Sequence, residues 1–161
     1  MSDEKGDSVQ GEREIDDQFR ALMEGLRTTI PGVIVLFSFL LVLPLQSSFA
    51  DISTSNTVLF YTAFSSAALA VVLLIAPSVH QRMRAPISGI ERRTQSHVMF
   101  ATKLTIAGTI FFLVSISSVV YLVSSLVFTE LTASVATAVI AGIAVWSWVY
   151  VPLIKFDTGD E

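Results

Sequence analysis

The placement of basic residues is the feature that most constrains this chain. All ten Lys and Arg residues lie outside four uncharged, strongly hydrophobic stretches. The stretches cover residues 28–50, 52–81, 104–129 and 131–154. Each is long enough for the ~20 residues that cross ~30 Å of hydrocarbon as a helix. The sequence therefore predicts an all-α protein whose chain crosses a membrane four times.

The basic residues also predict the orientation of the four spans. Four of them precede the first stretch, five lie between the second and third, and Lys155 follows the fourth. The two other connections, around Asp51 and Glu130, contain none. Because basic flanking residues are retained in the cytoplasm, both termini and the middle connection are predicted to be cytoplasmic. The expected location is the cell (plasma) membrane, as a multi-pass protein.

The predicted organisation has four parts, and the apolar spacing of Ile15, Phe19, Leu22 and Leu26 identifies the second as an amphipathic helix. The parts are a disordered acidic tail (1–14), an amphipathic cytoplasmic helix (15–30), a transmembrane domain (31–155) and an acidic C-terminal tail (156–161). The transmembrane domain is predicted to be a four-helix bundle of two hairpins. Its spans are expected at about 31–48, 57–76, 98–122 and 131–154.

Three local features refine the predicted spans. Pro31 cannot continue the hydrogen-bond ladder of a preceding helix and Gly32 adds backbone freedom, so these two residues are a candidate hinge. Pro77 is expected to end the second span. The small face of that span, formed by Ala63, Ala67 and Ala70, would let another helix backbone approach closely.

Composition excludes several classes of function. The chain contains no cysteine, which rules out disulfides and thiolate chemistry. Its net charge of -4 is concentrated in the N-terminal tail, so no nucleic-acid partner is expected. A length of 161 residues, mostly in spans, has no room for a separate catalytic domain. We therefore predict that the protein is not an enzyme and has no catalytic, cofactor or metal site.

Five basic residues are the candidate contacts for lipid or a partner: Arg82, Arg84, Arg92, Arg93 and Lys103. The four arginines form the densest basic cluster, and three roles stay open for them. They can set the topology, attract anionic lipid, or pair with the acidic N-terminal helix. Lys103 is either an anchor whose side chain reaches the headgroups or a group that binds an ion, lipid or partner.

Two hypotheses for function follow. The first is a non-enzymatic scaffold that interacts with the lipid bilayer and with a membrane protein partner or further copies of itself. The alternative is a small ion transporter or channel subunit that acts as an oligomer, with Lys103, Ser115, Ser118 and His97 along the path. Serines in spans also serve as ordinary hydrogen-bond donors between helices. Carboxylates near the middle of a span, which proton or sodium pathways use, are missing.

One segment resembles a known family. Residues 26–41 read LRTTIPGVIVLFSFLL, and Pro44, Phe49, Ala76-Pro77, His80 and Arg82 follow, then Lys103-Leu104 and Ala107-Gly108. This series resembles a prokaryotic family of short four-span membrane proteins known only as a domain of unknown function. The resemblance covers roughly residues 15–125, and Lys103 stands where that family usually has Arg. It implies an integral membrane protein of uncharacterised role, sometimes labelled an antiporter, and no site residue is carried over from it.

Overall fold

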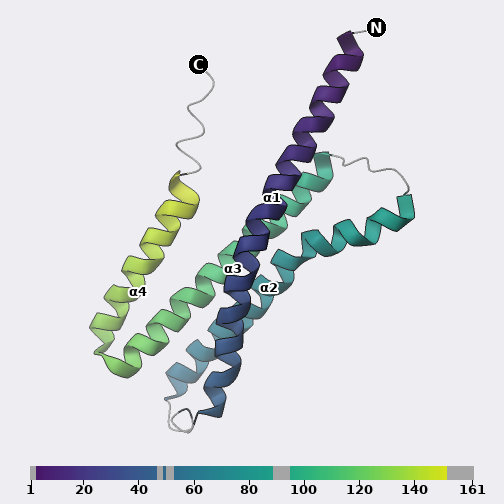
Figure 1. The fold of residues 1–161 in the computed structure, drawn as a ribbon. Coiled ribbons are helices and arrows are strands. Elements are labelled where there is room, and N and C mark those ends of the chain that lie inside the picture. The colour runs from purple at the N-terminus through teal and green to yellow at the C-terminus, as the bar shows by residue number, and fades with distance from the viewer. Residues whose placement is uncertain (1–2, 47–48, 50–52, 89–94, 152–161) are drawn as a thin grey trace. The chain divides into compact units, whose positions relative to one another are not determined.

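A computed structural model describes residues 3–46, 49, 53–88 and 95–151 of the chain. Every element in these ranges is helical (Figure 1). The elements are α1 (Asp3–Val42), the 3-10 turn η1 (Leu43–Leu45), α2 (Thr54–Ser88), α3 (Gln95–Val127), α4 (Glu130–Val145) and the π-helical turn η3 (Trp146–Tyr150). The all-α prediction is confirmed.

The first helix is longer than the sequence predicts. α1 begins at Asp3 and runs without interruption through Pro31 to Val42, where we predicted a disordered tail to residue 14 and a separate helix over 15–30. Arg13 and Asp17, opposite charges four residues apart, favour continuation of the helix across the predicted boundary at residue 14. Each such spacing stabilises a helix by roughly 0.2–0.5 kcal/mol.

The second helix also exceeds its prediction. α2 covers Thr54–Ser88 and does not end at Pro77, which is buried within it. A proline removes one backbone hydrogen bond, and neighbouring helices compensate for such a loss inside a membrane-type helix. At its other end, Ser53 Oγ accepts a hydrogen bond from the Asn56 amide at 3.3 Å, which caps the helix.

The last two helices agree with the predicted positions more closely. α3 extends three residues beyond the expected start and five beyond the expected end. α4 begins at Glu130 after Thr129, whose side chain accepts a hydrogen bond from the Thr132 amide. It passes into η3 at Trp146, while residues 152–154 of the predicted fourth span and the tail over 156–161 lie outside the described residues.

Two compact units divide the chain. Unit 1 consists of Met1–Ser38 and Ala68–Ile110, and it holds parts of α1, α2 and α3. In its core Phe19 of α1 packs with Val98 and Ala101 of α3. Ser78 of α2 contacts the Met23 sulfur of α1 at 3.6 Å. All three helix segments of unit 1 therefore contact one another through side chains.

Unit 2 consists of Phe39–Ala67 and Phe111–Glu161. In this unit Ser115 of α3 donates a hydrogen bond to the Ala63 carbonyl oxygen of α2. Phe112 of α3 stacks on Trp148 of η3, with ring centroids 6.3 Å apart. Phe49 meets Phe60 edge to face at 4.8 Å. Aromatic rings and one buried hydroxyl thus contribute contacts within unit 2, beside buried apolar residues such as Leu40 and Leu122.

Burial along the helices follows a period of seven residues. The buried residues of α1 are Phe19, Leu26, Val33 and Leu40. The same spacing recurs on α3 at Ala101, Gly108, Ser115 and Leu122. A seven-residue period is that of the seam between helices that cross at about 20°, the usual angle in membrane bundles. On α2 the predicted small face is confirmed, because Ala63, Ala67 and Ala70 are fully buried.

Outside these seams the helices expose apolar side chains. Four helices are long and apolar enough to cross a membrane, over Arg13–Leu45, Thr54–Met83, Gln95–Val127 and Glu130–Tyr150. No more than 28% of the most apolar window of any of them is buried within the protein. Exposed apolar surface of this extent marks a face that meets lipid or another protein.

Candidate functional site

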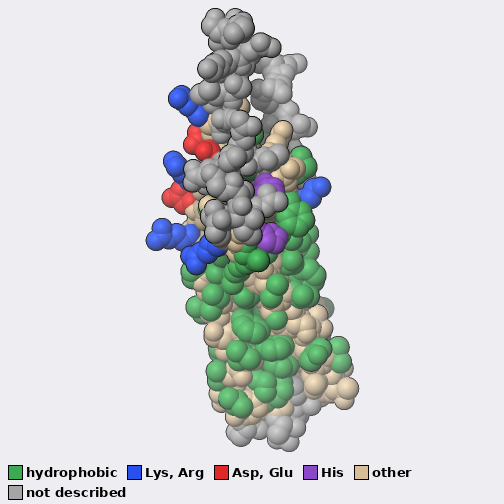
Figure 2. All heavy atoms as spheres, turned by 90° about the vertical axis from the view of Figure 1, so that its right-hand side faces the viewer, with side chains coloured by type: hydrophobic (Ala, Val, Ile, Leu, Met, Phe, Trp, Pro, Cys, Tyr) green, Lys and Arg blue, Asp and Glu red, His purple; other side chains and the backbone are tan. Residues whose placement is uncertain are grey.

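The predicted contact residues that the structure describes lie in unit 1. Arg82 is exposed on α2, and Lys103 is exposed on α3. Figure 2 shows Lys and Arg side chains gathered with Asp and Glu in the upper half of the view, above a surface of hydrophobic side chains. Arg84 belongs to α2, but its side chain is not described, and Arg92 and Arg93 lie outside the described residues. The predicted contacts of these five residues stay predictions.

A ring stack fixes where Arg82 and Lys103 lie along their helices. His80 of α2 stacks on Phe100 of α3 with centroids 5.9 Å apart and planes 22° apart. Arg82 follows His80 by two residues, and Lys103 follows Phe100 by three on a helix that runs the opposite way. At 1.5 Å per residue their backbones are about 8 Å apart along the pair of helices. Both cations thus belong to the end of unit 1 that holds this ring stack.

α2 and α3 pack closely at Gly108 in unit 1. A Cβ atom built there would lie 2.8 Å from Leu74 Cγ and 3.3 Å from Leu73 Cβ. Leu74 is fully buried. A glycine is therefore required at this position, since any side chain would overlap a core leucine. The sequence indicates Gly108 only through the family resemblance and does not predict this contact.

In unit 2 the same pair of helices is joined by Ser115. Its side chain is fully buried, and Oγ donates to the Ala63 carbonyl oxygen at 2.8 Å. Ser118 Oγ donates to the Val114 carbonyl oxygen of its own helix at 2.9 Å. Both serines named for an ion path thus hydrogen-bond to backbone carbonyls, the ordinary role of serine between and within membrane helices.

The candidate hinge at Pro31 and Gly32 lies inside α1. Proline has no amide hydrogen to donate to the Arg27 carbonyl. The hydroxyls of Thr28 and Thr29 donate to carbonyl oxygens four residues earlier, at 3.2 and 3.0 Å, a bond that often bends helices. A Cβ at Gly32 would meet no atom within 4 Å, so packing does not require this glycine. The bend itself stays a prediction.

His80 and His97 are the two imidazoles of the chain, and both belong to unit 1. His80 is exposed and stacked on Phe100, and His97 is half-buried near the start of α3. Within the described ranges, no three or more His, Cys, Asp or Glu side chains are grouped so that they could hold a metal ion.

The fold and the site together define a class: an all-α protein with four candidate membrane spans, in which Arg82 and Lys103 are exposed on unit 1. The chain belongs to a family of unknown function, DUF6328, which matches residues 9–152. This confirms the resemblance to such a family and extends it beyond residue 125 to include α4. Its prokaryotic origin and four-span topology stay predictions. No protein with a curated description matches the chain, and no solved structure matches it either.

Proposed function

We propose that this chain is a multi-pass integral membrane protein of the plasma membrane, with both termini and the connection between α2 and α3 in the cytoplasm. The observation that carries the proposal is four helices of sufficient length and apolarity whose surfaces remain largely unburied. Exposing this apolar area to water would be unfavourable, whereas contact with the hydrocarbon of a lipid bilayer carries no such cost. The absence of Lys and Arg from the connections near Asp51 and Glu130 supports the orientation.

Within the membrane, the protein acts as a non-enzymatic scaffold. α2 and α3 pack closely at Gly108 within unit 1 and at Ser115 within unit 2, and close helix packing in each unit supports a structural role. Arg82 and Lys103, exposed on unit 1, are the groups that meet lipid headgroups or a partner. Long basic side chains near helix ends extend to the interface while their methylene stems stay in hydrocarbon.

The alternative, a transporter or channel subunit, has less support. The hydroxyl groups of Ser115 and Ser118 donate hydrogen bonds to backbone carbonyl oxygens, and this pairing gives no support to a water-filled path lined by them. Lys103 is exposed on α3, and it would line a conduit only if several copies assembled around it. The two functions therefore differ in whether Lys103 affects ion flux.

Reconstitution of the full chain into liposomes tests the choice. We expect proton, sodium, potassium and chloride fluxes equal to those of protein-free liposomes, with the same result for Lys103→Ala. Ion-sensitive dyes inside the vesicles report the flux, and a channel-forming peptide serves as the positive control. A flux that Lys103→Ala abolishes and Arg13→Ala preserves would contradict the scaffold and establish the transporter, since Arg13 is an exposed arginine of α1 far from any span centre.

A further inference from the structure

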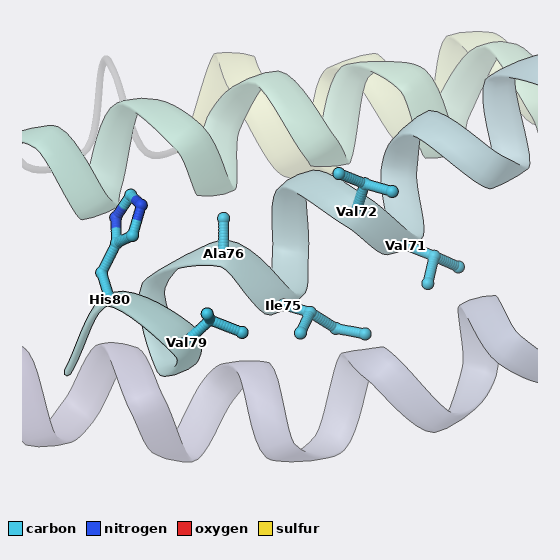
Figure 3. A pocket seen from close by; sticks show the side chains of 6 residues that line it. All are labelled: Val71, Val72, Ile75, Ala76, Val79 and His80. Atoms are coloured by element: carbon cyan, nitrogen blue, oxygen red, sulfur yellow. The ribbon is translucent and has the colours of Figure 1, made fainter. Parts of the chain in front are cut away.

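An open groove runs along α2 in unit 1, with a volume of about 370 Å³ (Figure 3). Its side chains form two rows at four-residue spacing, and only one of them is polar. The rows are Val71, Ile75 and Val79, and Val72, Ala76 and His80. Ala76 keeps the middle of the second row shallow because its side chain is a single methyl group.

The length of the groove indicates which kind of molecule it can bind. From Val71 to His80 the helix rises about 14 Å, which is close to half of the ~30 Å hydrocarbon thickness and thus to one leaflet. Apart from His80, the side chains that line the groove are apolar. An apolar surface of this length suits an acyl chain that lies along α2 within one leaflet.

Basic side chains near one end of the groove indicate which lipid headgroup would bind there. His80 closes that end, and the exposed Arg82 follows two residues later, nearer the end of α2. The stack of His80 on Phe100 holds the imidazole there, and the exposed Lys103 lies one turn along α3 from Phe100. Basic side chains at the surface of a leaflet attract anionic headgroups. A single lipid could thus place its acyl chain in the groove and its phosphate at Arg82.

We propose that this groove binds one acyl chain of an anionic glycerophospholipid from the leaflet at the His80 end of the groove, with the phosphate at Arg82. The inference rests on the proposed membrane function and assigns it a ligand. The sequence alone predicts a possible attraction of the arginines for lipid but no acyl-chain site.

Native mass spectrometry of the full chain released from nanodiscs tests the site. The nanodiscs contain equal amounts of phosphatidylglycerol and phosphatidylcholine. We expect the wild type to retain phosphatidylglycerol in preference to phosphatidylcholine. Ala76→Phe, which fills the groove, should reduce retention of both lipids about tenfold. Arg82→Ala should keep a bound lipid but lower the preference for phosphatidylglycerol about fivefold, the factor expected for one basic residue at an anionic surface.

Matched variants control for side-chain size and charge. Val58→Phe adds an aromatic ring at an exposed position of α2 in unit 2, and Arg13→Ala removes an exposed arginine of α1. Neither should change lipid retention. Val72→Phe, on the exposed wall of the groove, repeats the Ala76→Phe test at a site where packing inside the protein is not disturbed. Circular dichroism checks that each variant keeps its helix content.

Equal retention in Val72→Phe and Val58→Phe would overturn the site, as would equal preference in Arg82→Ala and Arg13→Ala. A dimer that Val72→Phe disrupts irrespective of lipid composition would also overturn it, in favour of a protein occupant. Each of these outcomes leaves four membrane-spanning helices in place. Failure of the chain to enter a bilayer would instead remove the proposed function itself.

Discussion

Replacing Gly108 by leucine is expected to destabilise the protein by about 3 kcal/mol, the upper part of the range for overpacking a core. A Cβ alone would come within 2.8 Å of Leu74 Cγ and 3.0 Å of Leu74 Cδ2. Leu74 is fully buried, so it has no open space to move into. The new side chain would therefore force α2 and α3 apart in unit 1.

Unfolding in mixed detergent micelles, followed by circular dichroism, measures the effect of Gly108→Leu. Gly142→Leu on α4 is the matched control, because a Cβ there meets nothing within 4 Å. It should leave stability within ~1 kcal/mol of the wild type, the size of the difference in helix propensity. Adding Leu74→Ala to Gly108→Leu should restore part of the loss through direct coupling. Equal losses for the two glycine variants would refute the close contact.

Replacing Leu122 by alanine is expected to cost about 2 kcal/mol. Leu122 is 2% exposed and continues the seven-residue seam of α3. Removing its side chain leaves a cavity, for which buried leucines lose 2–5 kcal/mol in water-soluble proteins. The lower limit applies here because lipid, and not water, surrounds an apolar side chain when membrane helices separate.

Leu126→Ala on the same helix is the control for Leu122→Ala, since Leu126 is 56% exposed. Its truncation opens no cavity, and in detergent it should change the unfolding free energy by less than about 0.5 kcal/mol. The same micelle unfolding assay compares the two variants. A larger loss for Leu126→Ala than for Leu122→Ala would contradict the buried position of Leu122 on α3.

Hydrophobicity and charge predicted the existence and type of the four long helices, but the helix ends were predicted less well. A proline was taken as a stop at Pro77 and as the start of a new helix at Pro31, yet α2 and α1 both continue through it. Each proline removes only one hydrogen bond, and a long apolar helix gains more by continuing than by exposing its remaining backbone groups.

The buried face of a helix could be predicted from the sequence only where small side chains marked it. Ala63, Ala67 and Ala70 revealed the buried face of α2 because small residues mark close helix contacts. Apolar residues occupy both the buried and the exposed sides of α3, so hydrophobicity does not distinguish Leu122 from Leu126. The groove beside Ala76 could not be predicted either, because its lining depends on which face of α2 the other helices leave uncovered.

The central claim, that four helices cross a membrane with every basic segment on the cytoplasmic side, is tested most directly by single-cysteine labelling. The chain has no cysteine, so each introduced thiol reports alone. With a membrane-impermeant maleimide on intact cells, we expect labelling at Ser55→Cys and Phe128→Cys, and at Ser96→Cys only after permeabilisation. All three positions are exposed in the structure. Labelling of Ser96→Cys in intact cells, with the other two protected, would contradict the account.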